Sequence, residues 1–195
     1  MNSTVRTIYT AAAYWSWVVL FVVWLPGCFV TKPTVRTPRR GRQIVTSVLL
    51  TGAFVFLVSS RTASIGLLAV PITPRVPLLG QIGLALDLAG VAFAIWARLT
   101  LGRNWSGLIT VKAYHELIRT GPYAVVRHPI YTGLLAAMLG TALTIGRLGA
   151  YLGVLSGLAA LLMRVRDEDA LMAEEFPDAH RTYRTRTKAL IPFVW

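Results

Sequence analysis

Five stretches of the chain are almost free of charged side chains, and charged connectors separate them. They cover residues 8–30, 44–60, 77–97, 129–146 and 148–163. An α-helix needs about 20 apolar residues to cross a hydrocarbon core of about 30 Å, because it rises about 1.5 Å per residue. The pattern therefore predicts an all-α fold, a polytopic membrane helical bundle of about five transmembrane helices with a cytoplasmic helical tail.

Prolines and glycines indicate where these helices bend or end. The Pro26-Gly27 pair is expected to bend or end the first helix. Whether the second helix continues past Arg61 is left open by the sequence. A Gly-Arg-Leu-Gly sequence at 146–149 separates the last two stretches, which predicts a tight helical hairpin. In the tail, Pro177 is expected to break the helix and to begin a second one.

The basic residues predict the orientation of the helices. Sixteen of the 20 Lys and Arg side chains lie in the connectors 31–43 and 98–127 and in the tail 164–195. Five spans place these three segments on one side of the membrane. The positive-inside rule makes that side cytoplasmic and puts the N-terminus outside.

Composition supports a bilayer environment and weighs against other classes of function. Of the 195 residues, 55% are hydrophobic and 14% are charged, whereas soluble domains carry about 25% charged residues. The formal net charge of +12 raises nucleic acid as a partner. The basic residues flank apolar stretches, however, so a rim that faces anionic lipid explains them better, and we expect no nucleic acid. The single cysteine, Cys28, excludes a disulfide within the chain.

Several polar and small residues within the apolar stretches are interpreted as structural. Asp87 lies in the middle of the third stretch and is a functional candidate, but we favour a carboxyl group bonded within the bundle. Small residues four positions apart allow helices to approach closely. These pairs are Gly133 with Ala137, Ala136 with Gly140, and Gly153 with Gly157. Trp15, Trp17, Trp24, Trp96 and Trp195 are interpreted as belt or lipid-facing residues.

Two clusters of polar residues could carry chemistry. Arg127 and His128 directly precede the proline that opens the fourth stretch, and Tyr131 follows within one turn. An ordinary interfacial belt explains these residues about equally well. Arg164 and Glu168 are four residues apart, so they share one helix face where the fifth helix leaves the membrane. A surface ion pair is the alternative for this second cluster.

The order of these elements resembles the isoprenylcysteine carboxyl methyltransferase family over about residues 98–193. The resemblance rests on residues 101–106, 115–118, 121–123 and 127–131, and on the tail residues Arg164, Glu168, Asp169, Phe176, Tyr183 and Pro192. The Arg-His-Pro element alone also occurs in phospholipid N-methyltransferases and membrane sterol reductases. The tail departs from the family pattern at Asp169, Pro177 and His180, where Glu, Gly and Tyr are usual.

The resemblance implies a site for S-adenosyl-L-methionine that is built without a Rossmann fold, at the membrane face. In agreement, the chain has no Gly-x-Gly-x-x-Gly after a strand-like stretch. The family's cofactor-binding positions correspond to His115, Gly121, Tyr123, Arg127, His128, Tyr131 and Glu168. The catalytic candidates are Arg164 and Glu168, which match a charged pair linked to substrate handling. No metal is expected, because the three histidines lack zinc-site spacing.

The implied reaction assigns roles to these residues and divides the chain in two. Arg127 or His128 is expected to hold the carboxylate of S-adenosyl-L-methionine, and Arg164 the carboxylate of a prenylated acceptor that enters from the bilayer. Residues 1–97 form three N-terminal transmembrane helices. Residues 98–195 form the catalytic region, with the cofactor-binding loop, the helical hairpin and the tail. Trp105 and Asn104 suit either the mouth of the site or an interfacial anchor.

Other functions stay open at this point. The same fold could instead methylate an amine headgroup, as a phospholipid methyltransferase does, or a small lipid. A membrane reductase of the sterol type would use NADPH, but it calls for a longer chain and a site for the 2′-phosphate. A non-catalytic scaffold that only binds lipid is a third alternative, and the acidic residues gathered with the basic ones at one face argue against it. The identity of the acceptor and the oligomeric state are not predicted.

Overall fold

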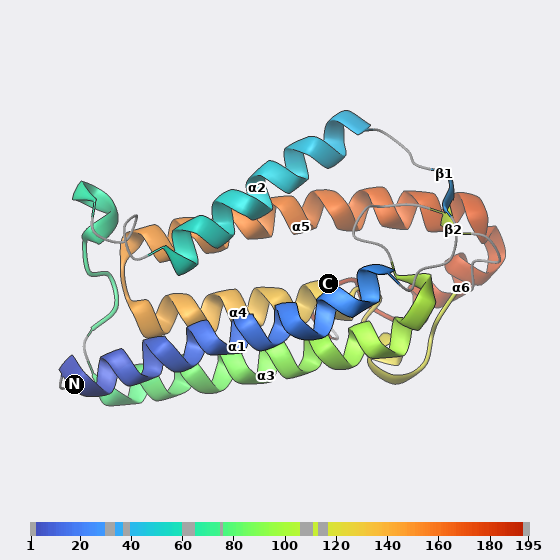
Figure 1. The fold of residues 1–195 in the computed structure, drawn as a ribbon. Coiled ribbons are helices and arrows are strands. Elements are labelled where there is room, and N and C mark those ends of the chain that lie inside the picture. Colours follow the sequence, from blue (N-terminus) through green and yellow to red (C-terminus); the bar gives the residue numbers. More distant parts are fainter. Residues whose placement is uncertain are drawn as a thin grey trace.

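The computed structural model describes residues 3–29, 34–36, 40–59, 65–74, 76–105, 111–112 and 117–192. The long helices lie in two layers (Figure 1). The α-helices are α1 (Ser3–Phe29), α2 (Arg40–Val58), α3 (Pro77–Leu101), α4 (Pro129–Ile145), α5 (Leu148–Glu175) and α6 (Pro177–Arg186). Helices α1, α3 and α4 pack side by side, and α2 packs along α5 in the second layer. The predicted helical bundle is thus confirmed.

Short elements join the helices at the two ends of the bundle. Strand β1 (Thr34–Arg36) pairs antiparallel with β2 (Val111–Lys112), so the connector after α1 meets the connector after α3. Three 3₁₀ turns cover Gly66–Ala69, Gly102–Asn104 and Gly121–Ala124. The hydrophobic pattern did not indicate the strands, because two or three residues are too few to display an alternation of period two.

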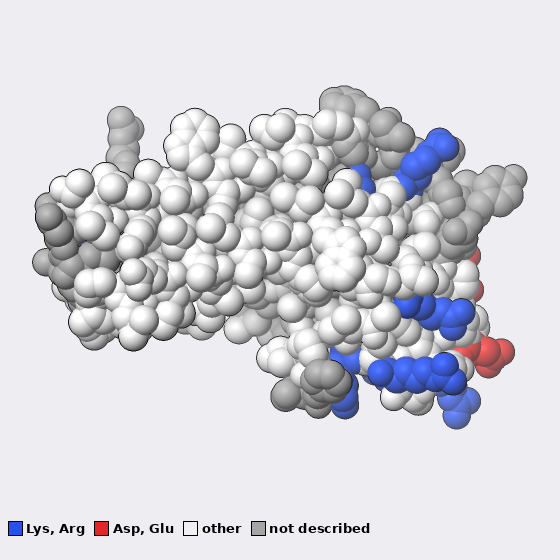
Figure 2. All heavy atoms as spheres, turned by 90° about the horizontal axis from the view of Figure 1, so that it is seen from below, with Lys and Arg blue, Asp and Glu red and all other residues white. Residues whose placement is uncertain are grey.

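Within the part of the chain that the structure describes, four helices are long and apolar enough to cross a bilayer, and α4 is a shorter apolar helix. The four apolar segments are Thr4–Pro26, Gly41–Val58, Pro77–Asn104 and Leu148–Glu175. The chain is therefore a multi-pass integral membrane protein. Charged side chains on the face in Figure 2 gather at the end of the bundle that holds α6, and the other described residues on that face carry no charge.

The observed helix ends agree with most of the proline and glycine positions. The hairpin is confirmed: α4 ends at Ile145, Gly146 adopts φ +70°, and α5 begins at Leu148. Phe176 separates α5 from α6, which starts at Pro177 as predicted. Helix α1, however, does not end at Pro26 but continues to Phe29. Helix α2 ends at Val58 and does not continue as one helix to residue 70.

Glycines allow α3 and α4 to approach until their backbones touch. A Cβ atom at Gly90 would lie 2.5 Å from the backbone nitrogen of Ala137, and one at Gly133 would lie 2.6 Å from the carbonyl oxygen of Gly90. Gly153 on α5 faces α2 in the same way, 2.9 Å from the carbonyl oxygen of Ala53. The small residues at helix-packing spacing are therefore used as expected.

The carboxyl group of Asp87 joins three helices in the middle of the bundle. Asp87 is fully buried. Ser16 of α1 donates to its Oδ2 at 2.6 Å, and Thr141 of α4 donates to its Oδ1 at 2.8 Å. The indole N–H of Trp17 in turn donates to Thr141 Oγ1 at 2.9 Å. The structural interpretation of Asp87 is thus confirmed, because its polar atoms are satisfied within the bundle.

The close approach of α3 and α4 predicts that Gly90→Ala destabilises the protein. The added methyl group meets backbone atoms of α4 that cannot rotate away, so overpacking should cost about 1–3 kcal/mol. The control is Gly52→Ala on α2, where a Cβ atom has no neighbour within 4 Å. That change should leave the stability equal or slightly higher, because Ala favours helix over Gly by about 1 kcal/mol. Thermal unfolding in detergent compares the two, and equal midpoints would contradict the prediction.

Candidate active site

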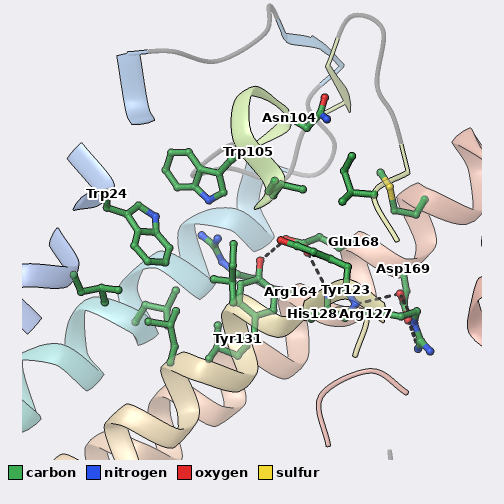
Figure 3. Close-up of a pocket in the computed structure, with 18 of the residues that line it drawn as sticks. Trp24, Asn104, Trp105, Tyr123, Arg127, His128, Tyr131, Arg164, Glu168 and Asp169 are labelled. Carbon is green, nitrogen blue, oxygen red and sulfur yellow. Dashed lines mark hydrogen bonds and ion pairs between the residues drawn. The ribbon is translucent and has the colours of Figure 1, made fainter. Parts of the chain in front are cut away.

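A cavity of about 560 Å³ lies between the two helical layers at the end of the bundle near α6. This volume is typical of pockets that enclose a small organic molecule. Its polar lining consists of Thr51, Asn104, Tyr123, Arg127, His128, Tyr131, Arg164, Glu168, Asp169, His180 and Tyr183. Most of these side chains surround one region of the cavity, where the start of α4 faces the outer part of α5 (Figure 3).

The tail positions the residues that precede α4. The backbone N–H groups of Arg127 and His128 donate to the carbonyl oxygens of Lys188 and Ala189, at 2.8 and 3.0 Å. Thr132, in the first turn of α4, donates through its hydroxyl to the carbonyl oxygen of Leu190 at 2.7 Å. Residues 187–190, called the tail strap below, therefore run beside the Arg-His-Pro turn and hold it in place.

The imidazole of His128 lies between the carboxylates of two neighbouring acidic residues. Its Nδ1 is 3.2 Å from Glu168 Oε2, and its Nε2 is 3.2 Å from Asp169 Oδ1. Although burial opposes protonation, the bonds to Asp169 and Glu168 outweigh it and raise the pKa of His128 above its usual 6.5. The ring also stacks on Tyr131, with ring centres 5.7 Å apart. A protonated His128 can donate to both carboxylates at once.

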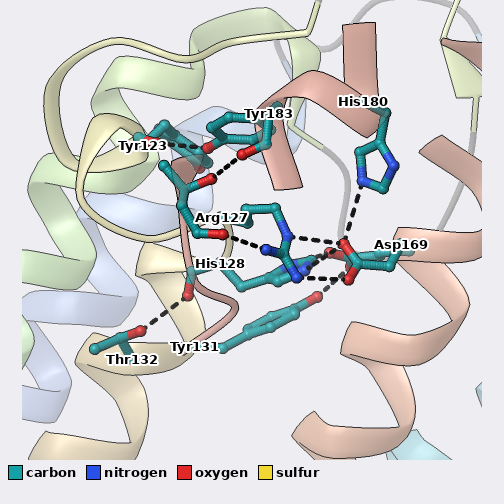
Figure 4. Close-up of polar contacts among 10 residues, drawn as sticks. Tyr123, Arg127, His128, Tyr131, Thr132, Asp169, His180 and Tyr183 are labelled. Atoms are coloured by element: carbon teal, nitrogen blue, oxygen red, sulfur yellow. Dashed lines mark hydrogen bonds and ion pairs between the residues drawn. The ribbon is translucent and has the colours of Figure 1, made fainter. Parts of the chain in front are cut away.

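The guanidinium group of Arg127 is bound within the protein (Figure 4). Its Nε and Nη2 donate to the two carboxylate oxygens of Asp169, at 3.4 and 3.0 Å, and its Nη1 donates to the carbonyl oxygen of Thr187 at 2.5 Å. Arg127 thus connects α5 to the tail strap. These bonds favour a positioning role for Arg127 over direct contact with a ligand.

Glu168 is the more accessible of the two carboxylates. The Glu168 side chain is 28% exposed and that of Asp169 is 15% exposed. The hydroxyl of Tyr131 donates to Glu168, and Arg164 lies beside the same hydroxyl. Asp169 is also 3.3 Å from His180 Nε2. Asp169 therefore binds protein groups on several sides, whereas Glu168 faces the cavity together with Arg164.

Aromatic side chains form the opposite wall of the cavity. The rings of Trp24 and Trp105 meet edge to face with centres 6.2 Å apart, and the guanidinium of Arg98 lies 4.3 Å from the centre of the Trp105 ring.

Burial raises the pKa of Tyr183 to about 12, so its hydroxyl stays protonated and donates to the carbonyl oxygen of Tyr123 at 2.5 Å. This bond attaches α6 to the 3₁₀ turn before α4.

The structure brings together most of the residues selected from the sequence. Tyr123, Arg127, His128, Tyr131, Arg164 and Glu168 all line the cavity. Gly121 is not among the lining residues. It adopts φ +58° at the start of a 3₁₀ turn, a conformation that favours glycine, so its role is in the backbone. His115, Trp195 and the side chain of Cys28 lie outside the described part of the chain.

The tryptophans were assigned only in part correctly. Trp15 and Trp96 are 67% and 51% exposed, as expected of lipid-facing residues. The interpretation of Trp17 as a belt or lipid-facing residue is wrong, because Trp17 is buried and lines the cavity, whereas Trp24 is half-buried and also lines the cavity. A hydrophobic run that is apolar on every face gives no periodicity from which the inward side could be read. Trp105 and Asn104 both line the cavity, in keeping with the first of the two interpretations of these residues.

The arrangement suits a ligand that carries both charges and an apolar part. One carboxylate and one guanidinium, those of Glu168 and Arg164, face the polar part of the cavity. Tryptophan and tyrosine rings can stack on a planar group or attract a cation. The remainder of the cavity runs between α1, α2, α4 and α5 and is lined mainly by leucine, phenylalanine and methionine, together with Trp17 and Thr51.

Comparison with known proteins adds independent findings. Residues 83–174 match the model of the isoprenylcysteine carboxyl methyltransferase family. The chain is 35% identical over 115 residues to the cobalt-zinc-cadmium resistance protein CzcN of Cupriavidus metallidurans, which is 56% of this chain and 49% of that protein. It is 30% identical over 106 residues to a protein-S-isoprenylcysteine O-methyltransferase of Schizosaccharomyces pombe, which is 50% of this chain and 43% of that enzyme. A second such enzyme, from Arabidopsis thaliana, is 25% identical over 60% of both chains.

The chain therefore spans about half the length of the first curated relatives that it matches. The matched region begins in α3 and ends near the end of α5. It includes the Arg-His-Pro turn, Tyr131 and both carboxylates of the polar cluster.

The two histidines of the cluster should titrate on opposite sides of pH 6.5. Carboxylates raise the pKa of His128, whereas burial lowers that of His180 despite the nearby Asp169. The contribution of His128 to stability is then fully present below pH 6.5 and is lost as the pH rises through its raised pKa. NMR of labelled histidines in micelles measures both values, with His115→Gln and His180→Gln variants for assignment.

In the same experiment, Asp169→Asn should lower the pKa of His128, because one of its two carboxylate partners loses its charge. Asp178→Asn is the control, since Asp178 is exposed in the first turn of α6. A His128 that titrates at or below pH 6.5 in the unchanged protein would contradict the proposed charge state.

Arg127→Lys should loosen the tail strap while preserving the charge. A lysine cannot donate to both oxygens of Asp169 and to the Thr187 carbonyl at the same time. Loss of bonds to a charged partner costs about 1.5–3 kcal/mol each, so trypsin should cleave residues 181–188 about tenfold faster or more. Arg181→Lys, at an exposed position of α6, serves as the control. An unchanged cleavage rate in Arg127→Lys would show that the guanidinium does not hold the tail.

Proposed function

We propose that the chain transfers a methyl group from S-adenosyl-L-methionine to a lipophilic carboxylate, because residues 83–174 match the model of the isoprenylcysteine carboxyl methyltransferase family. The acceptor is an isoprenylated cysteine or a similar compound. One observation supports this proposal above the others: a single cavity connects the charged groups around Glu168 with an apolar region between the helices.

The residues that line the polar part fit the chemistry of the donor. S-adenosyl-L-methionine is a cation at its sulfonium and ammonium groups, and it also carries a carboxylate and a flat adenine ring. Glu168 offers an accessible carboxylate for the ammonium group, and Trp24, Trp105 and Tyr123 offer rings for the adenine or the sulfonium. His128 and Tyr131 both bond Glu168, so its carboxylate is oriented before a ligand binds.

The reaction needs little acid–base chemistry from the protein. The donor supplies a methyl group activated by a positively charged sulfur. An acceptor carboxylate is already a nucleophile at neutral pH, so its oxygen forms the new bond to the methyl carbon while the carbon–sulfur bond breaks, and no proton moves. We assign to Arg164, which lines the same cavity, the role of holding this carboxylate in line with the methyl group. The apolar walls exclude water, because water inside the site would weaken this alignment.

The position of the cavity determines how the substrates reach it. Its apolar part lies between membrane helices, so the hydrophobic chain of the acceptor enters from the bilayer. Its polar part lies at the end of the bundle where the basic connectors and the tail gather. The positive-inside rule makes this end cytoplasmic and places the N-terminus outside. The donor then enters from the cytoplasm.

Isothermal titration of the detergent-purified protein with S-adenosyl-L-methionine, S-adenosylhomocysteine and NADPH tests the proposal. Glu168→Gln should weaken binding of S-adenosyl-L-methionine about 10- to 100-fold, because it removes the charge that faces the ammonium group. Glu175→Gln, at an exposed position seven residues further along α5, should bind as the unchanged protein does.

Binding of NADPH without S-adenosyl-L-methionine would refute the methyltransferase and favour a reductase. Equal affinity for S-adenosyl-L-methionine in Glu168→Gln and Glu175→Gln would refute the role of Glu168 in donor binding. Methylation of an amine headgroup in place of a carboxylate would keep the donor site but refute the proposed acceptor.

A further inference from the structure

The apolar part of the cavity, called the apolar arm below, has a closed deep end. Four helices contribute to it, and on each the lining residues stop at a large side chain: Trp17 on α1, Leu57 on α2, Met138 on α4 and Leu161 on α5. These four side chains are between 1% and 5% exposed. The cavity lining therefore ends where the four side chains come together inside the bundle.

Two of the four side chains are held in place by specific contacts. The indole of Trp17 donates to Thr141, which lies three residues beyond Met138 on α4 and is itself bonded to Asp87. The end of the Met138 side chain occupies the space left by Gly157 of α5, where a Cβ atom would overlap with its methyl group and lie 2.8 Å from its sulfur. The hydrogen bond from Trp17 fixes one side of the closed end. On the other side, Gly157 has no side chain, and this leaves room for the end of Met138.

The distance from the charged groups to this end is short. Tyr131, whose hydroxyl bonds Glu168, and Met138 are seven residues apart on α4, or about 10 Å along the helix axis. With carbon–carbon bonds of about 1.5 Å, an extended hydrocarbon chain covers this length in about eight carbons. That is the main chain of two isoprene units.

We propose that Met138, packed over Gly157 and beside the fixed indole of Trp17, limits the length of hydrocarbon that the site encloses to about eight main-chain carbons. This inference rests on the proposed function, since it takes the occupant of the apolar arm to be the hydrophobic chain of the methyl acceptor. It adds a substrate class: acceptors with a medium-length chain, such as a geranyl or octyl thioether of a small carboxylic acid. Carbons beyond the eighth gain no further contact with the protein.

A series of S-alkyl thioether carboxylates with 4 to 16 chain carbons tests this limit. Their affinity for the protein saturated with S-adenosylhomocysteine is measured by titration at a fixed detergent mole fraction. Each enclosed methylene should strengthen binding about fourfold, until the increase stops near eight carbons. Variants are compared with the unchanged protein at each length, so that partitioning into detergent cancels.

Two substitutions should move the limit in opposite directions. Met138→Ala removes the three heavy atoms beyond Cβ and should extend the increase by two to three carbons. Gly157→Ala pushes the end of Met138 into the apolar arm and should shorten the increase by at least one carbon. Leu139→Ala is the matched control, because Leu139 is the next residue on α4 and is 40% exposed on its outer side. It should leave the profile unchanged.

The outcomes separate this inference from the proposed function. If Met138→Ala binds S-adenosylhomocysteine normally and its profile still stops at the same length, the limit is not set by Met138 and the inference is overturned. The same conclusion follows if affinity in the unchanged protein rises steadily to 16 carbons. If neither S-adenosyl-L-methionine nor S-adenosylhomocysteine binds, the proposed function fails, and the chain-length profiles measured without them still decide whether Met138 closes the apolar arm.

Discussion

The site depends on the bonds between the Arg-His-Pro turn and two adjacent carboxylates of α5. Arg127 and His128 lie about 40 residues before Glu168 and Asp169 in the chain, and the hairpin of α4 and α5 brings the two pairs together. Each partner alone would be a buried charge with a large desolvation cost. Together they neutralise one another, so the charged cluster can exist at the end of an apolar bundle. The same four residues line the polar part of the cavity, so their bonds to one another determine the shape of that wall.

The bundle below the cluster is packed for rigidity. Glycines let α3 and α4 touch through their backbones, and Asp87 bonds α1 and α4 from α3. In lipid there is little hydrophobic driving force between helices, so close packing and internal hydrogen bonds take over that role. Thr141, which is bonded to Asp87, also accepts a hydrogen bond from Trp17 at the closed end of the cavity. A structural network in the middle of the membrane thus shapes the place where a hydrocarbon chain would end.

Features that depend on neighbouring residues were predictable from the sequence, and features that depend on distant ones were not. The turn at Gly146 and the start of α6 at Pro177 follow from local backbone preferences, and the structure has both. The inward position of Trp17 and Trp24 depends on which side of α1 meets the other helices, and an entirely apolar helix does not record this. The bond from Arg127 to the tail strap joins residues 60 positions apart, so the motif alone could not indicate it.

Glu168 and Asp169 illustrate how adjacent acidic residues come to have different tasks. Successive residues on a helix point about 100° apart, so the two carboxylates bond His128 at different ring nitrogens and differ in their other partners. Asp169 is directed at Arg127, His128 and His180, and these bonds use its oxygens. Its short side chain keeps the carboxylate close to α5, within reach of the turn before α4. Glu168 is one carbon longer, is more exposed, and is oriented by His128 and Tyr131 towards the cavity. Exchanging the two residues would therefore disturb the fold at one position and the binding of a cation at the other, although the net charge stays the same.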